Sequence, residues 1–149
     1  MDDFYDTDIG VQTSDILVLP SAFLGTLWTE LQNLGNDNAR SIMFKCGHTV
    51  GVNLSVNYVG MGTDDLDMVL NQAWAEAGLG HLFVIDSDKE NIVVKLENLL
   101  EIGIIGAKNN CDFTAGCITG VLEGLLQQPY SVVEDMVGEE NRLFTFKKR

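Results

Sequence analysis

Residues 111–126 read CDFTAGCITGVLEGLL, with glycine at every fourth position: Gly116, Gly120 and Gly124. A helix over this stretch carries a stripe without side chains, because positions four apart lie on one helix face. Each interior glycine costs about 0.5–1 kcal/mol relative to alanine, so three of them require a compensating contact. Two interpretations are open: the stripe packs closely against another helix, or it forms the floor of a ligand pocket.

Strand-like runs lie on both sides of this helix. Residues 82–85 and 92–96 are joined by a polar turn and precede it, and residues 130–137 and 142–147 follow it. Each pair is close enough in sequence to form an antiparallel hairpin. The apolar segment 98–110, interrupted by two glycines, is compatible with a short helix and a loop over the sheet.

Upstream, apolar residues recur at helical spacing over about 21–34, 38–58 and 64–77. Helices come first and strands come in adjacent pairs, which is typical of the α+β class. The expected fold has N-terminal helices packed on an antiparallel sheet of two hairpins, with the glycine-striped helix between the hairpins.

Length and composition indicate one domain, residues 1–149, of which 1–12 form a mobile acidic arm. The apolar run Ile16–Leu19 follows this arm. The formal net charge of -13 makes nucleic acid and anionic membranes unfavourable partners. An odd number of cysteines, three, favours a reducing compartment, and the acidic N-terminus does not resemble a signal peptide. We therefore expect a cytoplasmic protein.

Motifs for catalysis or cofactor binding are missing from the sequence. There is no P-loop, no dinucleotide-binding glycine motif, no nucleophile elbow and no His-Glu-x-x-His. The two histidines, His48 and His81, lie in no recognisable nucleophile context. We therefore expect no cofactor and a binding role in place of catalysis.

The glycine helix and the strands after it resemble the C-terminal half of the vinyl-4-reductase domain family. The segment 45–51, KCGHTVG, is similar to the family's Gly-x-x-x-Gly helix, and AGLG at 77–80 is similar to its turn from helix to strand. The resemblance covers roughly residues 38–147. This family binds small molecules and is related to the TRAPP trafficking subunits and the haem nitric-oxide-binding sensors.

The resemblance implies a pocket for a small hydrocarbon or aromatic ligand between the striped helix and the sheet, used for sensing or carriage. Strand alternation, if its register is right, supplies the lining residues. We predict that the pocket is lined by Phe83, Ile85, Leu96, Cys117, Val121, Val132, Phe144 and Phe146.

Some members of the family, the phenol-responsive sensors among them, hold zinc with a cysteine before the glycine helix, a glutamate in the next strand and two later cysteines. Here Cys111 and Glu134 stand at the first two positions, but Val137 and Leu143 or Phe144 stand at the others. Two ligands do not close a tetrahedral structural site. We expect no metal, with Cys111 and Glu134 as vestigial positions.

Two other functions follow from the same resemblance. The first is a vinyl reductase, or an accessory protein, of tetrapyrrole chemistry. The second is a scaffold like the trafficking subunits, which pair through helices and carry an acyl chain. We also expect a homodimer, because apolar helix surface around Leu24, Trp28 and Leu31 and along 42–54 exceeds what one small sheet covers.

Overall fold

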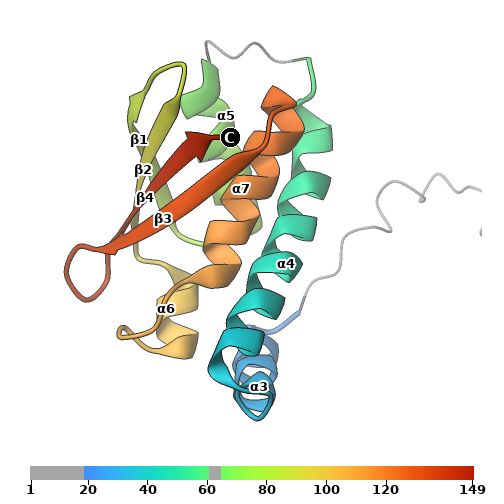
Figure 1. Ribbon diagram of the computed structural model, residues 1–149, viewed down its shortest axis with the longest axis vertical. Coiled ribbons are helices and arrows are strands. Elements are labelled where there is room, and N and C mark those ends of the chain that lie inside the picture. The colour runs from blue at the N-terminus through green and yellow to red at the C-terminus, as the bar shows by residue number, and fades with distance from the viewer. Residues whose placement is uncertain (1–18, 61–64) are drawn as a thin grey trace, which may run out of the picture.

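The computed structural model describes residues 19–60 and 65–149 and has an α+β fold, as predicted (Figure 1). Helices lie on one side of a four-stranded antiparallel sheet, and helix α7 lies between the two hairpins in sequence. The predicted acidic arm 1–12 and residues 16–18 of the predicted apolar run lie outside the described residues.

The helices begin and end close to the predicted positions. They are α3 (Ser21–Gln32), α4 (Asn36–Ser55) with the short 3-10 turn η1 (Val56–Tyr58), α5 (Leu66–Ala77), α6 (Leu100–Ile105) and α7 (Asp112–Leu126). Gly78 ends α5 in the left-handed conformation, with φ of 69°, which favours a residue without a Cβ atom. None of the described helices has the length and hydropathy needed to cross a membrane.

The sheet has the strand order β1-β2-β4-β3. Its strands are β1 (His81–Ser87), β2 (Asn91–Glu97), β3 (Tyr130–Met136) and β4 (Arg142–Lys148). The two predicted hairpins therefore form, and the antiparallel pairing of β2 with β4 joins them in the middle. An irregularity between Val84 and Asp86 shifts the register of β1 against β2.

The glycine stripe of α7 packs against α4. A Cβ atom added at Gly116 or Gly120 would overlap the backbone carbonyl of Phe44 or His48, and one at Gly51 would overlap that of Cys117. The two helices therefore approach until their backbones touch, with glycine on both sides of the contact. Of the two interpretations of the stripe, close helix packing is the one that the structure supports.

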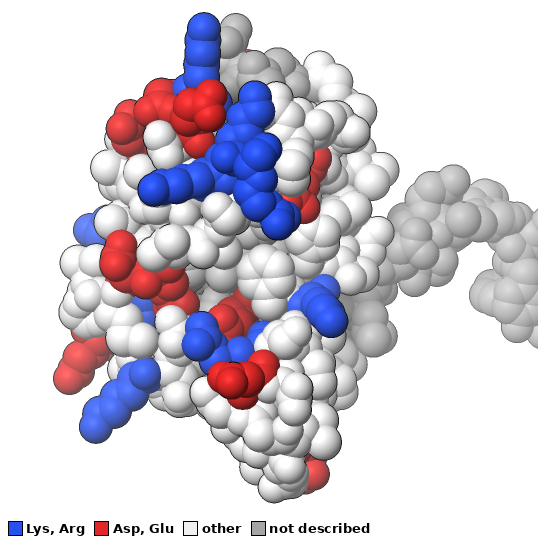
Figure 2. All heavy atoms as spheres, viewed as in Figure 1, with Lys and Arg blue, Asp and Glu red and all other residues white. Residues whose placement is uncertain are grey.

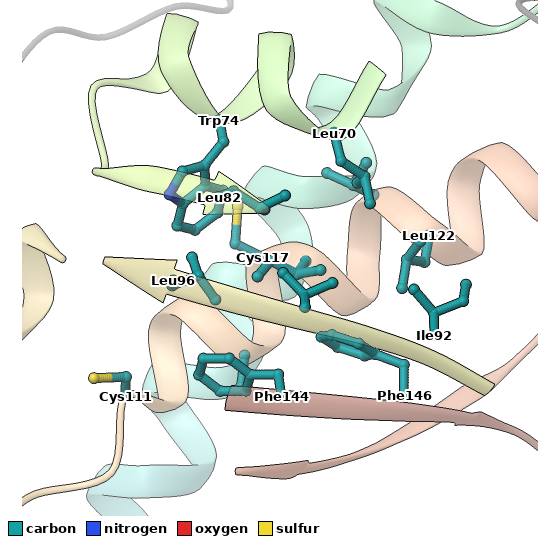
Figure 3. Close-up of a cluster of buried hydrophobic side chains, with 14 of the residues drawn as sticks. Leu70, Trp74, Leu82, Ile92, Leu96, Cys111, Cys117, Leu122, Phe144 and Phe146 are labelled. Atoms are coloured by element: carbon teal, nitrogen blue, oxygen red, sulfur yellow. The ribbon is translucent and has the colours of Figure 1, made fainter. Parts of the chain in front are cut away.

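The main core lies between the helices and the inner face of the sheet (Figure 3). Alternation along β2 and β4 directs Ile92, Val94 and Leu96, and then Phe144 and Phe146, into this core. On the view of Figure 2, basic side chains gather where β4 ends, and the acidic side chains are spread over several places. The core is thus mostly apolar, and its buried charged residues are Glu101, Asp112 and Arg142.

Candidate ligand-binding site

Five of the eight predicted lining residues meet in one buried cluster: Leu96, Cys117, Val121, Phe144 and Phe146. They come from β2, α7 and β4, which the sequence separates by up to 50 residues. The rings of Phe144 and Phe146 are stacked, with centroids 6.2 Å apart and an interplanar angle of 25°. The pairing of β2 with β4 and the packing of α7 above them create this arrangement.

The other three predicted lining residues are not buried members of this cluster. Val132 is partly buried and packs against the cluster, but Phe83 and Ile85 are 41% and 56% exposed. On β1 it is Leu82 that is buried, and Val84 that packs against the cluster. The predicted phase of β1 is therefore wrong by one residue, which turns Phe83 and Ile85 to the opposite face of the sheet.

Trp74 of α5 belongs to the same cluster and was not among the predicted lining residues. It is 2% exposed, and Figure 3 shows Cys117 of α7 pointing toward its ring. Trp74 is one of the apolar residues that recur at helical spacing over 64–77. What the sequence did not show is that this face meets β1 and α7 at the predicted ligand site.

The thiols of the cluster are unreactive. Burial raises the pKa of Cys117 to about 12, and burial with nearby carboxylates raises the pKa of Cys111 even further. Both thiols therefore stay protonated at neutral pH in the metal-free protein, and a protonated thiol is a poor nucleophile. Cys111 is fully buried and packs as a small apolar residue.

The histidines do not join the cluster. His48 lies on α4 and its Nε2 is 2.7 Å from Glu123 Oε1 on α7, so the pair ties the two helices together. Glu123 also accepts a hydrogen bond from the backbone N–H of Tyr130. His81 is exposed at the start of β1.

Several charged side chains lie beside the cluster, at the N-terminus of α7. Glu101 is buried and accepts hydrogen bonds from the backbone N–H groups of Phe113, at 3.0 Å, and Thr114, at 2.7 Å. Beside it Asp112 forms a bidentate pair with Arg40 of α4, at 2.9 and 3.2 Å. Carboxylates are favourable at a helix N-terminus because they accept from N–H groups that have no partner within the helix.

Arg142 is a buried cation that the sequence analysis did not single out. Its Nε donates to Glu134 Oε2 at 3.0 Å, and its other nitrogens donate to the carbonyls of Ala107 and Asn141. A signal for it was present, since Arg142 shares the inward face of β4 with Phe144 and Phe146. A charge on an inward face needs a buried partner, and Glu134 is that partner.

The vestigial metal positions do not fit a zinc ion. Both carboxylate oxygens of Glu134 accept from the backbone N–H of Cys111, at 2.9 and 3.0 Å, and Arg142 donates to the same carboxylate. No group of three or more His, Cys, Asp or Glu side chains that could hold a metal occurs in the ranges 19–60 and 65–149. The positive charge beside Glu134 therefore comes from the guanidinium group of Arg142.

We predict that purified protein carries no stoichiometric zinc, because Glu134 is bonded to Arg142 and to the Cys111 backbone. Elemental analysis of protein prepared with added zinc is the measurement. Cys111→Ser should leave the zinc content unchanged. One zinc per chain, lost in this variant, would contradict the prediction.

Glu101 should make stability depend on pH. Burial raises its pKa to about 7, which outweighs the hydrogen bonds from Phe113 and Thr114 that lower it. Between the ordinary value of 4.5 and about 7 the folded chain keeps a proton that the unfolded chain has released. The stabilisation from protonated Glu101 is therefore fully present near pH 4.5 and is lost as the pH rises to about 7. The unfolding free energy should fall by roughly 1–3 kcal/mol over this range.

The measurement is urea unfolding at several pH values, with Glu101→Gln compared with the wild type. The variant cannot ionise at position 101, so the difference in unfolding free energy should change between pH 4.5 and 7. Glu139→Gln, at an exposed position, is the control and should follow the wild type. Parallel pH profiles for Glu101→Gln and the wild type would mean that Glu101 stays ionised in the folded protein.

An open hollow lies beside the cluster, between α5 and β1, with a volume of about 530 Å³. It is lined by Asn71 and Ala75 of α5, by Gly78 directly after this helix and by His81, Leu82 and Phe83 of β1, among others. We call it the α5–β1 hollow. Leu82 also belongs to the buried cluster and is 2% exposed, so its side chain lies in the core.

Comparison with solved structures confirms the vinyl-4-reductase-like fold. The phenol-responsive sensory domain of the transcription activator PoxR, solved with phenol, matches with a TM-score of 0.72 and 19% identity, over 89% of this chain and 76% of that chain. A vinyl-4-reductase family protein from Methanocaldococcus jannaschii matches with a TM-score of 0.61 and 18% identity, over 91% and 85%. A structure from a study of H-NOX activation matches with a TM-score of 0.49 and 16% identity, over 89% and 75%.

No family model matches the chain, and no curated protein matches it either. The identities of the solved structures are all below 20%. The likeness therefore establishes the fold, and this chain's own residues must support its function.

Proposed function

We propose that this domain binds a small apolar molecule, aromatic or hydrocarbon, in the cytoplasm, as a sensor or carrier. The observation that carries the proposal is the meeting of Leu96, Cys117, Val121, Phe144 and Phe146 in one cluster. The fold around this cluster is the one in which the PoxR sensory domain was solved with phenol. The role proposed is binding without catalysis.

The chemistry of the cluster suits an apolar ligand. The cluster consists mainly of aliphatic and aromatic side chains. Its Cys117 thiol is neutral, because burial raises the pKa to about 12. Sites of this kind gain most of their affinity from shape and buried apolar area, while a few polar groups set orientation. The cluster residues contact one another in this conformation, so a ligand must bind a conformer in which they separate.

Native mass spectrometry of the purified protein tests the proposal. Copurification or uptake of an apolar molecule, one per chain, is the expected result. A bound species with an ultraviolet-visible chromophore would favour the reductase alternative. An empty chain that binds tightly to another protein would favour the scaffold alternative, and either result would contradict the proposal.

We also propose a homodimer, formed through the outer surface of α3 and α4. Of the residues predicted for this surface, Leu31 is buried and Trp28 packs inside the chain, so these two do not form it. The large apolar side chains that are exposed on α3, α4, η1 and the residues that follow α3 and η1 are Phe23, Leu34, Val50, Val52, Val56 and Val59. Exposed apolar surface of this extent usually marks a partner, and two-fold pairing of identical chains is the commonest arrangement.

Sedimentation equilibrium at micromolar concentration should give a mass about twice the 16.4 kDa of one chain. Val56→Asp, at a position 65% exposed, should shift the protein toward the monomer, because a charge would be buried in the interface. Met68→Asp, on the separate helix α5 and 52% exposed, is the matched control and should stay dimeric. A monomer mass for the wild type would contradict the dimer.

A further inference from the structure

The two edges of the sheet, β1 and β3, differ in how their outward backbone groups are bonded. On β1 the carbonyl of Leu82 accepts a hydrogen bond from Asn71 of α5 at 3.0 Å. The N–H group of Val84 donates to Asp67, directly before Asn71's turn of the same helix, at 3.3 Å. An edge strand with open N–H and C=O groups is a template for pairing with another strand. Side chains of α5 therefore protect the β1 edge.

The other edge strand, β3, has open backbone groups. Its ladder with β4 continues into the turn, where the N–H group of Val137 donates to the carbonyl of Asn141. Bonded and outward residues alternate along an antiparallel strand, so the odd-numbered residues of β3 are the ones bonded to β4. The outward backbone groups belong to Val132, Glu134 and Met136. Within residues 19–60 and 65–149 these groups have no hydrogen-bond partner.

The sequence of β3 leaves this edge accessible to another strand. Natural edge strands are commonly protected by lysine, proline or a bulge. The strand reads YSVVEDM, without lysine or proline, and its pairing with β4 has no register shift. The inward charge of Glu134 is already paired with Arg142. Val133, in the middle of the strand, is 55% exposed, so a further strand can approach along the whole of β3.

Charges of opposite sign lie at the two ends of β3. Beside its start, β4 ends in the exposed basic residues 147–149, which form the basic group in Figure 2. Near its end lie three exposed acidic residues, Asp135, Glu139 and Glu140. A second copy of β3 in antiparallel orientation would bring the acidic end of each copy beside the basic end of the other. The edge is thus complementary in charge to itself.

A two-fold axis at Val133 gives these open groups partners. In that register Val132 of each copy stands opposite Glu134 of the other, and each N–H group can donate to the opposite carbonyl. Met136 stands opposite Tyr130 in the same way. The two Val133 side chains meet at the axis, where directly opposite residues have Cβ atoms about 4.5–5.5 Å apart. Two-fold pairing of identical chains is also the commonest form of self-association.

We propose that two copies of this chain pair through β3, antiparallel about Val133, so that their sheets join into one. This contact does not depend on ligand binding and is separate from the surface of α3 and α4 proposed for the dimer. One pair of edge strands buries little area compared with the roughly 1,200–2,000 Å² of a stable interface. The β3 contact therefore forms at a higher protein concentration than the helix contact and joins two helix dimers.

Sedimentation equilibrium from micromolar to millimolar concentration tests the β3 contact, with Val56→Asp in every protein to weaken the helix contact. The mass of this parent protein should rise with concentration. Adding Val133→Lys sets like charges opposite each other at the axis and should weaken the association about 2- to 30-fold. Ile85→Lys, 56% exposed on β1, is the matched control and should associate as the parent does.

A mixture of two variants tests the two-fold register. Val133→Glu alone should associate as weakly as Val133→Lys alone, although the two substitutions change the net charge in opposite directions. An equimolar mixture should regain the association of the parent, because opposite charges then meet at the axis. A mixture that stays as weak as its components would overturn the proposal, and so would equal masses for the parent and Val133→Lys at every concentration.

Amide hydrogen exchange of the wild type gives a readout without any substitution. The amides of Val132, Glu134 and Met136 should exchange more slowly as the protein concentration rises. The amides of the odd-numbered residues 131–135, bonded to β4, should be protected at every concentration. Protection of the first set that does not depend on concentration would mean that the same chain covers its own edge, for example with residues 1–18. That result, or no protection at millimolar concentration, would overturn the proposal.

Discussion

Replacing Gly120 with alanine should destabilise the protein by at least about 1–3 kcal/mol, the usual cost of overpacking, and leucine should cost more. A Cβ atom at Gly120 would lie 2.8 Å from the Val52 nitrogen and closer still to the His48 carbonyl oxygen. Both atoms belong to the backbone of α4, which cannot turn aside as a flexible side chain can. The gain in helix propensity, about 1 kcal/mol, is too small to compensate.

Gly103→Ala is the matched control for this prediction. Gly103 lies inside α6, and a Cβ atom there would meet nothing within 4 Å. The same substitution should therefore raise the unfolding free energy by roughly 0.5–1 kcal/mol. Urea unfolding of the two variants gives the comparison. A stabilised Gly120→Ala protein would mean that α4 and α7 are not in backbone contact.

Replacing Arg142 with methionine should cost about 3–5 kcal/mol, as expected when one partner of a buried ion pair is removed. The Arg142 side chain is fully buried and that of Glu134 is 7% exposed. Without the guanidinium group, Glu134 keeps the Cys111 backbone N–H but loses its charge partner, and the carbonyl of Ala107 loses its donor. Thermal unfolding with calorimetry measures the loss.

Two further variants show whether this cost comes from the unpaired charge. Lys95→Met removes an ion pair with Glu97 whose side chains are 35% and 36% exposed, and should change stability by less than about 1 kcal/mol. Adding Glu134→Gln to Arg142→Met removes the unpaired charge and should recover part of the loss. Equal stability of Arg142→Met and Lys95→Met would show that the buried pair has no special role.

The helices and both hairpins could be predicted because each depends on a pattern within a short stretch of chain. The stripe of Gly116, Gly120 and Gly124 is visible from spacing alone. What the stripe contacts is a long-range property, and the matching glycines of α4 are more than 60 residues away in sequence. Periodicity therefore predicted the element but left its partner open.

The inward-facing residues of the strands were predictable where apolar and polar residues alternate. On β4 the alternation from Arg142 to Phe146 sets the phase, and Phe144 and Phe146 point inward as predicted. On β1 the run 82–85 is apolar at every position, so no polar residue marks the outer face. The register shift between Val84 and Asp86 also interrupts the alternation of inward and outward residues along β1.

The buried polar groups were harder to predict. Glu101 and Arg142 are stabilised by partners such as the Thr114 N–H and Glu134 that lie 8 or more residues away. The cost of burying a charge is set by those partners, so a sequence alone does not show that it is met. The unpaired N–H of Trp74 is likewise visible only once its surroundings are known.

The most direct test of the proposed site is the position of a bound ligand. Protein with labelled Leu, Ile and Val methyl groups is mixed with toluene, and nuclear Overhauser contacts between toluene and the protein are recorded. The proposal predicts contacts to the methyl groups of Leu96 and Val121, which are buried in the cluster. Contacts limited to Ile85 and Val133, which are exposed on β1 and β3, would place the ligand outside the core and contradict the proposal.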